Sequence, residues 1–219
     1  MKEIRSDIQI GVIHQALRME ASNGLLEPVV HIINRLTHYS ILNFFKTGIF
    51  DYQIPLSSHI HDETMSPKTD FVGLQYYTRP VIGFTGSTSY GEPMTQMPFR
   101  EDPAGLYEMV LETFDAFHKP VIVTENGIST HDAEQRKRYN ERALYTLKRA
   151  ADTIGHENVR GDYTWSFCDN SEWDMGRHPQ AFGAYALQDD GSLALEPKAG
   201  MEPVIEAATR SAAAKEKVA

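Results

Sequence analysis

The amino-acid sequence predicts an α/β fold built on a parallel sheet, because short runs of β-favouring residues alternate with longer helical patterns. Four such runs occur, at residues 8–14, 70–78, 120–124 and 161–168. Segments long enough to hold a helix separate them, as crossover connections between parallel strands require. The pattern therefore favours βα units that lie side by side.

Each helical segment carries a start or stop signal. Pro28 suits the first turn of a helix, whose amides have no intrahelical partner, and the spacing after it predicts one core-facing stripe of Val29, Ile32, Ile33 and Leu36. Amphipathic helices are expected at residues 106–117 and 132–154, the latter ending at a left-handed Gly155 cap. The C-terminal part predicts a hairpin-like stretch at 182–195 with its turn at 189–191, a helix from Glu202 and a frayed tail at 212–219.

Length and composition narrow the class of molecule. A chain of 219 residues fits a single domain over 1–219, and 41% apolar residues suffice for a core. The formal net charge of -9 is spread along the chain, so neither nucleic acid nor a membrane is expected as a partner. Cys168 is the sole cysteine, and the sequence has neither a secretory signal nor an apolar run of about 20 residues. We expect a soluble, cytoplasmic protein.

Glu125 is the sharpest candidate for a catalytic residue. It follows the apolar run at 120–124 and precedes Asn126-Gly127, so its carboxylate is expected at the tip of a buried strand. The carboxyl ends of parallel strands are where α/β architectures build their sites. The competing interpretation is that these residues form an ordinary polar turn.

A second candidate group follows the last predicted strand. Trp165, Glu172 and Trp173 lie within nine positions and include both tryptophans of the chain. A sugar presents C–H faces that pack on indoles and hydroxyls that bond to carboxylates, so the group favours a carbohydrate site. The pair Tyr76-Tyr77 is expected to point to the same end. Alternatively, Trp165 belongs to the core and Glu172 is a solvated loop acid.

Several short strings in this sequence resemble the carboxyl-terminal half of the family-1 glycoside hydrolases, the β-glucosidase family. They occur in the family's order and, with the first predicted strand, cover the chain from about residue 8 to 198. The strings are Gln75-Tyr76-Tyr77-Thr78, Asp102-Pro103-Ala104-Gly105-Leu106-Tyr107, Thr124-Glu125-Asn126-Gly127, Trp165-Ser166-Phe167-Cys168-Asp169-Asn170-Ser171-Glu172-Trp173 and Phe182-Gly183.

The resemblance implies a (β/α)₈ barrel that hydrolyses β-glycosides with retention and without a cofactor. By position, Glu125 would be the nucleophile and Tyr77 would donate a hydrogen bond that orients it. The sugar would contact Gln75, Trp165, Glu172, Trp173 and Phe182. Glu172 and Trp173 match members that act on unphosphorylated sugars. Gln75 replaces the family's usual Asn, and Ser171 its usual Phe.

One expected catalytic group is missing from the sequence. Retaining hydrolysis needs a second carboxyl group as acid/base, which the family places in an Asn-Glu-Pro motif at its fourth strand. This chain contains no Asn-Glu-Pro, and its Glu-Pro pairs suit helix starts and turns. The order of motifs predicts half a barrel, strands five to eight with their helices.

Half a closed sheet has two open edges and an exposed apolar face. We therefore expect a second chain with strands one to four, self-association, or an inactive fragment. The alternative function is that of a non-catalytic half-barrel with a sugar-binding or a structural role.

A metal site is not predicted. Residues 46–69 are rich in Pro, Ser, His and Gly and read as one long loop, which is typical of a functional segment. His59 and His61 lie in this loop without a matching acid cluster, so solvated histidines are the expected outcome.

Overall fold

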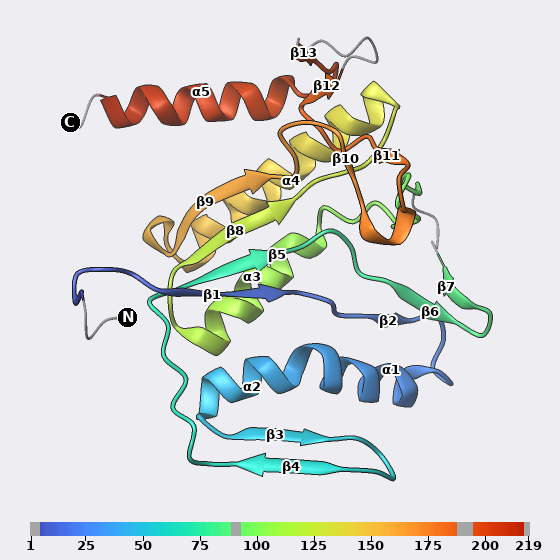
Figure 1. Cartoon of the computed structure of the whole chain (residues 1–219), viewed down its shortest axis with the longest axis vertical. Coiled ribbons are helices and arrows are strands. Elements are labelled where there is room, and N and C mark those ends of the chain that lie inside the picture. The colour runs from blue at the N-terminus through green and yellow to red at the C-terminus, as the bar shows by residue number, and fades with distance from the viewer. Residues whose placement is uncertain (1–4, 89–92, 188–194, 217–219) are drawn as a thin grey trace.

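The structure, a computed structural model, describes residues 5–88, 93–187 and 195–216, and its centre is a parallel sheet of four strands. These are β1 (Gly11–Gln15), β5 (Phe71–Gln75), β8 (Val121–Asn126) and β9 (Val159–Thr164), hydrogen-bonded in that order (Figure 1). Every neighbouring pair is parallel. The predicted α/β class with a parallel sheet is confirmed, although β1 begins later and β9 ends earlier than the sequence suggested.

Helices cover one face of this sheet and form the core with it. The main cluster joins Leu74 of β5 and Val121 and Val123 of β8 to the helix α3 (Gly105–Phe117). Ala150 adds the helix α4 (Ala133–Ile154) to the same cluster. Because side chains alternate along a strand, one set of strand residues fills this core and the other set faces the opposite side of the sheet.

The boundaries of α3 and α4 agree with the sequence signals. Asp132 caps α4 by accepting hydrogen bonds from the amides of Glu134 and Gln135, at 2.9 and 3.1 Å. Gly155 follows the helix with φ 98° and ψ 136°, so its φ is positive but its ψ lies outside the expected left-handed helical region. The final helix α5 (Glu202–Glu216) continues through residues 212–216, which were expected to be frayed. Alanine, lysine and glutamate are strong helix formers, which accounts for the extension.

The stripe predicted for the first helix is wrong. Val29 and Ile32 are exposed, whereas Val30, Asn34, His38 and Leu42 are buried. Within α1 (Glu27–Asn34) the buried side is the one that carries the polar Asn34, which a pattern of apolar residues does not include. A π-helical turn at Arg35–Tyr39 then joins α1 to α2 (Ser40–Thr47). Asn34 is satisfied there by hydrogen bonds with the backbone N and O of Met19.

The segment at 46–69 is not one long loop. It contains the antiparallel strands β3 (Phe50–Gln53) and β4 (His59–Asp62), which lie beyond α2 from the main sheet in Figure 1. The remaining elements are small sheets and 3-10 turns: β2 (Glu20–Ala21), β6 (Val81–Gly83), β7 (Gly86–Thr88), η2 (His156–Asn158), β10 (Asn170–Ser171), η3 (Trp173–Met175), β11 (Pro179–Gln180), β12 (Tyr185–Leu187) and β13 (Leu195–Pro197).

The hairpin expected near 182–195 corresponds to β12 and β13, which pair antiparallel. Its expected turn at 189–191 lies outside the described residues.

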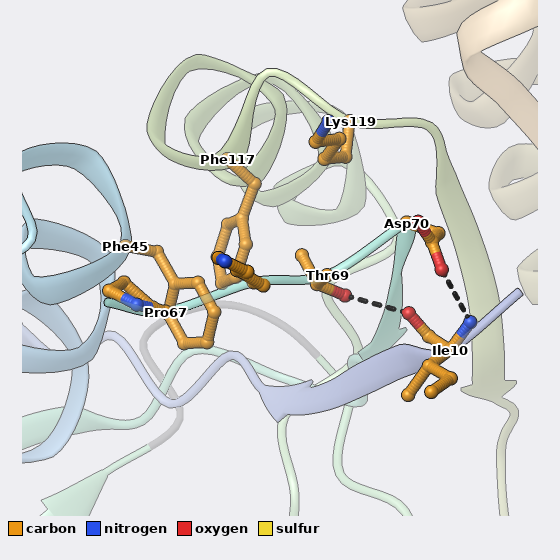
Figure 2. Close-up of a pocket in the computed structure, with 8 residues that line it drawn as sticks. Ile10, Phe45, Pro67, Thr69, Asp70, Phe117 and Lys119 are labelled. Carbon is orange, nitrogen blue, oxygen red and sulfur yellow. Dashed lines mark hydrogen bonds between the residues drawn. The ribbon is translucent and has the colours of Figure 1, made fainter. Parts of the chain in front are cut away.

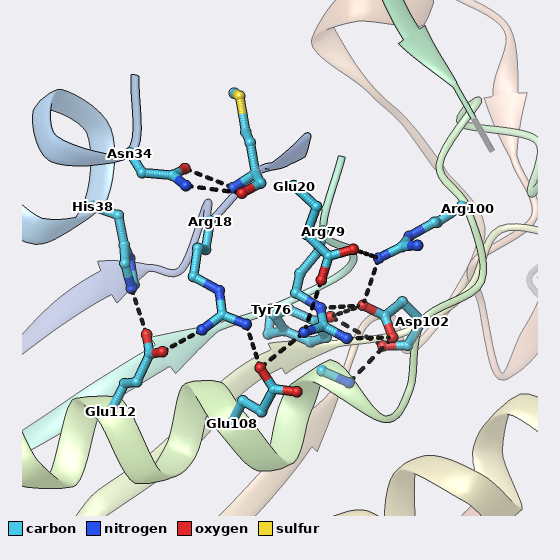
Figure 3. Close-up of polar contacts among 12 residues, drawn as sticks. Arg18, Glu20, Asn34, His38, Tyr76, Arg79, Arg100, Asp102, Glu108 and Glu112 are labelled. Atoms are coloured by element: carbon cyan, nitrogen blue, oxygen red, sulfur yellow. Dashed lines mark hydrogen bonds and ion pairs between the residues drawn. The ribbon is translucent and has the colours of Figure 1, made fainter. Parts of the chain in front are cut away.

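A network of charged side chains anchors the segments that follow β1 and β5 (Figure 3). Arg79 donates to both carboxylate oxygens of Asp102, at 2.6 and 3.3 Å, and Tyr76 donates to one of them at 2.8 Å. Arg18 pairs with Glu108 and Glu112 of α3. Arg79 and Asp102 are largely buried, and buried ion pairs of this kind are costly to break. The network therefore holds the carboxyl ends of β1 and β5 against α3.

The other face of the sheet is open. Ile13 on β1, Tyr163 on β9 and Phe167 just after it are 62%, 66% and 65% exposed. A pocket of about 540 Å³ lies on this side, lined by Phe71, Ile122, Thr124, Tyr163, Thr164, Trp165, Ser166 and Phe167. The four parallel strands and their one-sided helical cover are consistent with part of a barrel.

Among the described helices, none combines the length and apolarity that a membrane crossing requires.

Candidate active site

Glu125 lies near the carboxyl end of β8 and is held from the neighbouring strand. Its residue partner across the β5–β8 pairing is Gln75. The Gln75 side-chain amide donates to Oε1 of Glu125, and the Tyr77 hydroxyl donates to Oε2 at 2.8 Å. Each carboxylate oxygen therefore has its own donor, which fixes the plane and direction of the group.

Tyr77 is suited to remain a donor. Burial raises the pKa of its hydroxyl well above the ordinary value, and the hydrogen bond to Glu125 and the charges of Glu125 and Glu172 raise this pKa further. A hydroxyl with such a pKa stays protonated at neutral pH.

Tyr77 packs against the aromatic ring of Phe182. Phe182 is buried and its ring meets that of Tyr77 edge to face, with centroids 5.9 Å apart. Asp169 accepts from the amide of Gly183 at 2.9 Å and pairs with Lys198, so it anchors the segment that carries Phe182. No local pattern predicts this role for Asp169, because its contacts join segments 14 and 29 residues apart.

Tyr76 does not share the direction of Tyr77. Its ring is fully buried and its hydroxyl donates to Asp102 in the network of Figure 3. Successive residues of an extended chain point to opposite sides, so only one of the two tyrosines can face the sheet edge that carries Glu125. The expectation that both point to this end is wrong for Tyr76.

The second predicted group is brought together only in part. The indole N–H of Trp165 donates to Oε1 of Glu172 at 3.2 Å, and the amide of Asn170 donates to the same oxygen at 2.5 Å. Trp173 stands apart, because this residue is 100% exposed to solvent. Asn170 thus belongs to this cluster, and its position two residues before Glu172 is the only sequence signal for that role.

The opposite end of the sheet holds a different pocket, of about 410 Å³ (Figure 2). Ile10 and Asp70 immediately precede β1 and β5, and the Asp70 carboxylate accepts from the Ile10 amide at 2.7 Å. The stacked rings of Phe45 and Phe117 form part of its wall. Features at the amino end of barrel strands generally serve stability, so this pocket is not the candidate active site.

The fold and site together define a class: a parallel α/β protein with an oriented carboxylate at a strand tip, as in barrel enzymes. A match to the family described as Glycosyl hydrolase family 1 covers residues 42–200, so the chain belongs to that family. This confirms the resemblance seen in the sequence.

Individual relatives agree with the family assignment. The chain is similar to a beta-galactosidase of Sulfolobus acidocaldarius, with 29% identity over 67% of this chain and 32% of that protein. Its fold is similar to a beta-glycosidase from Pyrococcus horikoshii, with TM-score 0.73, 22% identity and coverage of 91% and 48% of the two chains. A family 1 β-glucosidase from Thermotoga maritima in complex with isofagomine lactam gives TM-score 0.74, 20% identity and coverage of 91% and 50%. The chain thus spans about a third of that curated relative and about half of these solved structures.

Proposed function

We propose that this chain supplies the nucleophile half of a retaining β-glycosidase, strands five to eight of a (β/α)₈ barrel. The observation that carries the proposal is the carboxylate of Glu125, which receives one hydrogen bond from Gln75 and one from Tyr77. An ionised, oriented carboxylate can attack an anomeric carbon and form a covalent glycosyl-enzyme. Water then displaces the enzyme from the same face, so the configuration of the sugar is retained.

The surroundings of Glu125 suit a sugar in the neighbouring position. Trp165 would provide the face beneath the ring, and Phe182 the wall beside it. Glu172 would accept from outer hydroxyls, and its hydrogen bonds from Trp165 and Asn170 hold it in place. The exposed Trp173 would turn its indole N–H toward the sugar on binding. Relatives named as beta-galactosidase and beta-glucosidase support a β-glycoside as substrate.

The leaving oxygen must also receive a proton, and this role falls to a carboxyl group outside the present chain. We assign it to a complementary four-stranded β/α half, in the same polypeptide or in another. Three observations support this partner: β1 and β9 are the outer strands, the apolar side chains of Ile13, Tyr163 and Phe167 are exposed, and solved family relatives are about twice as long.

A mechanism-based label tests the nucleophile directly. The label is a 2-deoxy-2-fluoro-β-glucoside with a dinitrophenyl leaving group. Dinitrophenolate departs without being protonated, so the sugar can attach to the nucleophile even though the acid group is missing. Mass spectrometry should find one sugar on the peptide that contains Glu125, and none in Glu125→Gln. The exposed Glu134→Gln is the matched control and should label as the wild type does.

The outcomes separate the competing functions. Labelling without turnover, followed by turnover when the amino-terminal half of a family relative is added, supports the proposal. Glucose binding without labelling would favour the non-catalytic sugar-binding alternative. A native mass of two chains together with turnover by the chain alone would assign the open face to a second copy instead.

A further inference from the structure

The β3–β4 hairpin has two chemically different faces. Phe50 and Tyr52 alternate with Asp51 and Gln53 along β3, and the Phe50 ring packs edge to face on Phe44 of α2 at 5.6 Å. The apolar residues therefore hold the hairpin against the helix. Asp51 and Gln53 take the other face, which is exposed to solvent.

The exposed face gathers two imidazoles and a carboxylate. In the antiparallel register Asp51 lies opposite His61, and Gln53 lies opposite His59, so all four share a face. One potential ligand atom each from Asp51, His59 and His61 lies within 4.8 Å of the others. Nε2 of His59 is 2.6 Å from the Asp51 carboxylate.

A further carboxylate stands at the edge of this group. Oε1 of Glu63 is 3.0 Å from Nε2 of His61. It can either serve as a fourth ligand or accept from the ring N–H that a bound metal leaves free, which is the usual partner of a ligating histidine.

We propose that Asp51, His59 and His61 form a surface site for a divalent transition-metal ion such as Zn²⁺. Two imidazole nitrogens and one carboxylate oxygen are ligands that Zn²⁺, Ni²⁺ and Cu²⁺ accept, and they leave a position for water or Glu63. Tetrahedral Zn²⁺ places its ligand atoms roughly 3.4 Å apart. The three side chains are about half exposed and can rotate to close that gap, while backbone pairing keeps their Cα positions fixed.

The site is independent of the proposed glycosidase function. Figure 1 places the hairpin beyond α2, on the far side of that helix from the sheet that carries Glu125. A metal ion there would bind to the outside of the fold.

Isothermal titration of the untagged, EDTA-treated chain with ZnCl₂ at pH 7.5 tests this site. We expect one ion per chain, and a loss of affinity of about 10- to 100-fold or more in His59→Ala, His61→Ala and Asp51→Asn. Binding should weaken at pH 5.5, because protons compete for imidazole nitrogen. Mg²⁺ should not compete, since it prefers oxygen ligands.

The matched control is His156→Ala. His156 forms a similar exposed pair with Asp152 on α4, at 2.9 Å, and should not affect the affinity. Equal affinity in the wild type and the His59→Ala/His61→Ala variant, no saturable binding, or one ion per two chains would each overturn the proposal. Thermal melts without metal should be unchanged in the hairpin variants, which excludes misfolding as the cause of a loss.

Discussion

The backbone at Gly127 lies directly against the carbonyl group of Trp165. A Cβ atom at Gly127 would stand 2.0 Å from the Trp165 oxygen and 3.1 Å from its carbonyl carbon. The Trp165 amide also donates to the carbonyl of Asn126 at 2.8 Å. The chain just after Glu125 on β8 is therefore in direct contact with the backbone of Trp165 just after β9. This contact links the two parts of the candidate site.

Gly127→Ala should destabilise the fold and displace Trp165. The new methyl group would meet backbone rather than a flexible side chain, and overpacking of this kind costs about 1–3 kcal/mol. Chemical denaturation gives the loss of stability, and the fluorescence of a Trp173→Phe background reports on Trp165 alone. Gly24→Ala is the control, because a Cβ there meets nothing within 4 Å. Equal stability of the two alanine variants would contradict the close contact.

Tyr77→Phe should slow formation of the glycosyl-enzyme without weakening binding of the label. It removes one of the two donors to Glu125 and leaves the ring packed on Phe182. A misdirected nucleophile costs roughly 10²-fold in rate. The measurement separates the maximal labelling rate from the concentration of fluoro-glycoside that gives half of it. Tyr145→Phe, on the exposed side of α4, should match the wild type. A change confined to the half-saturating concentration would assign Tyr77 to binding instead.

His14 should make the fold sensitive to acid. Burial, and next the charge of His38, lower the pKa of His14 from 6.5 to about 4. The unfolded chain takes up this proton at a higher pH than the folded chain, so stability falls as the pH drops from about 6.5 to 4, by about 3 kcal/mol. His38 contacts His14 through Nδ1 at 3.1 Å and Glu112 through Nε2 at 3.1 Å.

Urea denaturation of the wild type and His14→Gln at pH 7.5 and 4.5 measures this effect. The glutamine cannot take up the proton, so the variant should lose less stability over this interval. Parallel losses would show that His14 does not titrate differently on folding.

Asp162 should have the opposite pH dependence. Burial raises the pKa of its carboxyl from 3.8 to about 7, and Oδ1 has no hydrogen-bond partner among the described residues. The unfolded chain releases the proton first, so stability falls as the pH rises from about 4 to 7, by about 4 kcal/mol. Asp162→Asn should therefore stabilise the protein at pH 8 and have little effect near pH 4. The exposed Asp152→Asn should show no such gain at pH 8, and a gain equal in both variants would argue against burial as the cause.

Much of the architecture could be predicted because its signals are local. The apolar run before Glu125, the Asp132 cap and the helical period of α4 each depend on residues within a few positions of one another. The apolar pattern fails at α1, where the buried side includes Asn34, held by hydrogen bonds with the backbone of Met19. Local signals also concealed the β3–β4 hairpin, because the pairing of Asp51 with His61 depends on a register that composition does not encode.

The sequence by itself determined the α/β alternation, the family and the position of Glu125 at a strand tip, because propensity and motif order are written along the chain. Only the tertiary structure decided that Gln75 and Tyr77 bind the two oxygens of Glu125, that Tyr76 turns into the charged network, and that Trp173 stays outside the cluster. These contacts join residues up to 50 positions apart. Their geometry follows from strand register and packing, which emerge only when the whole sheet assembles.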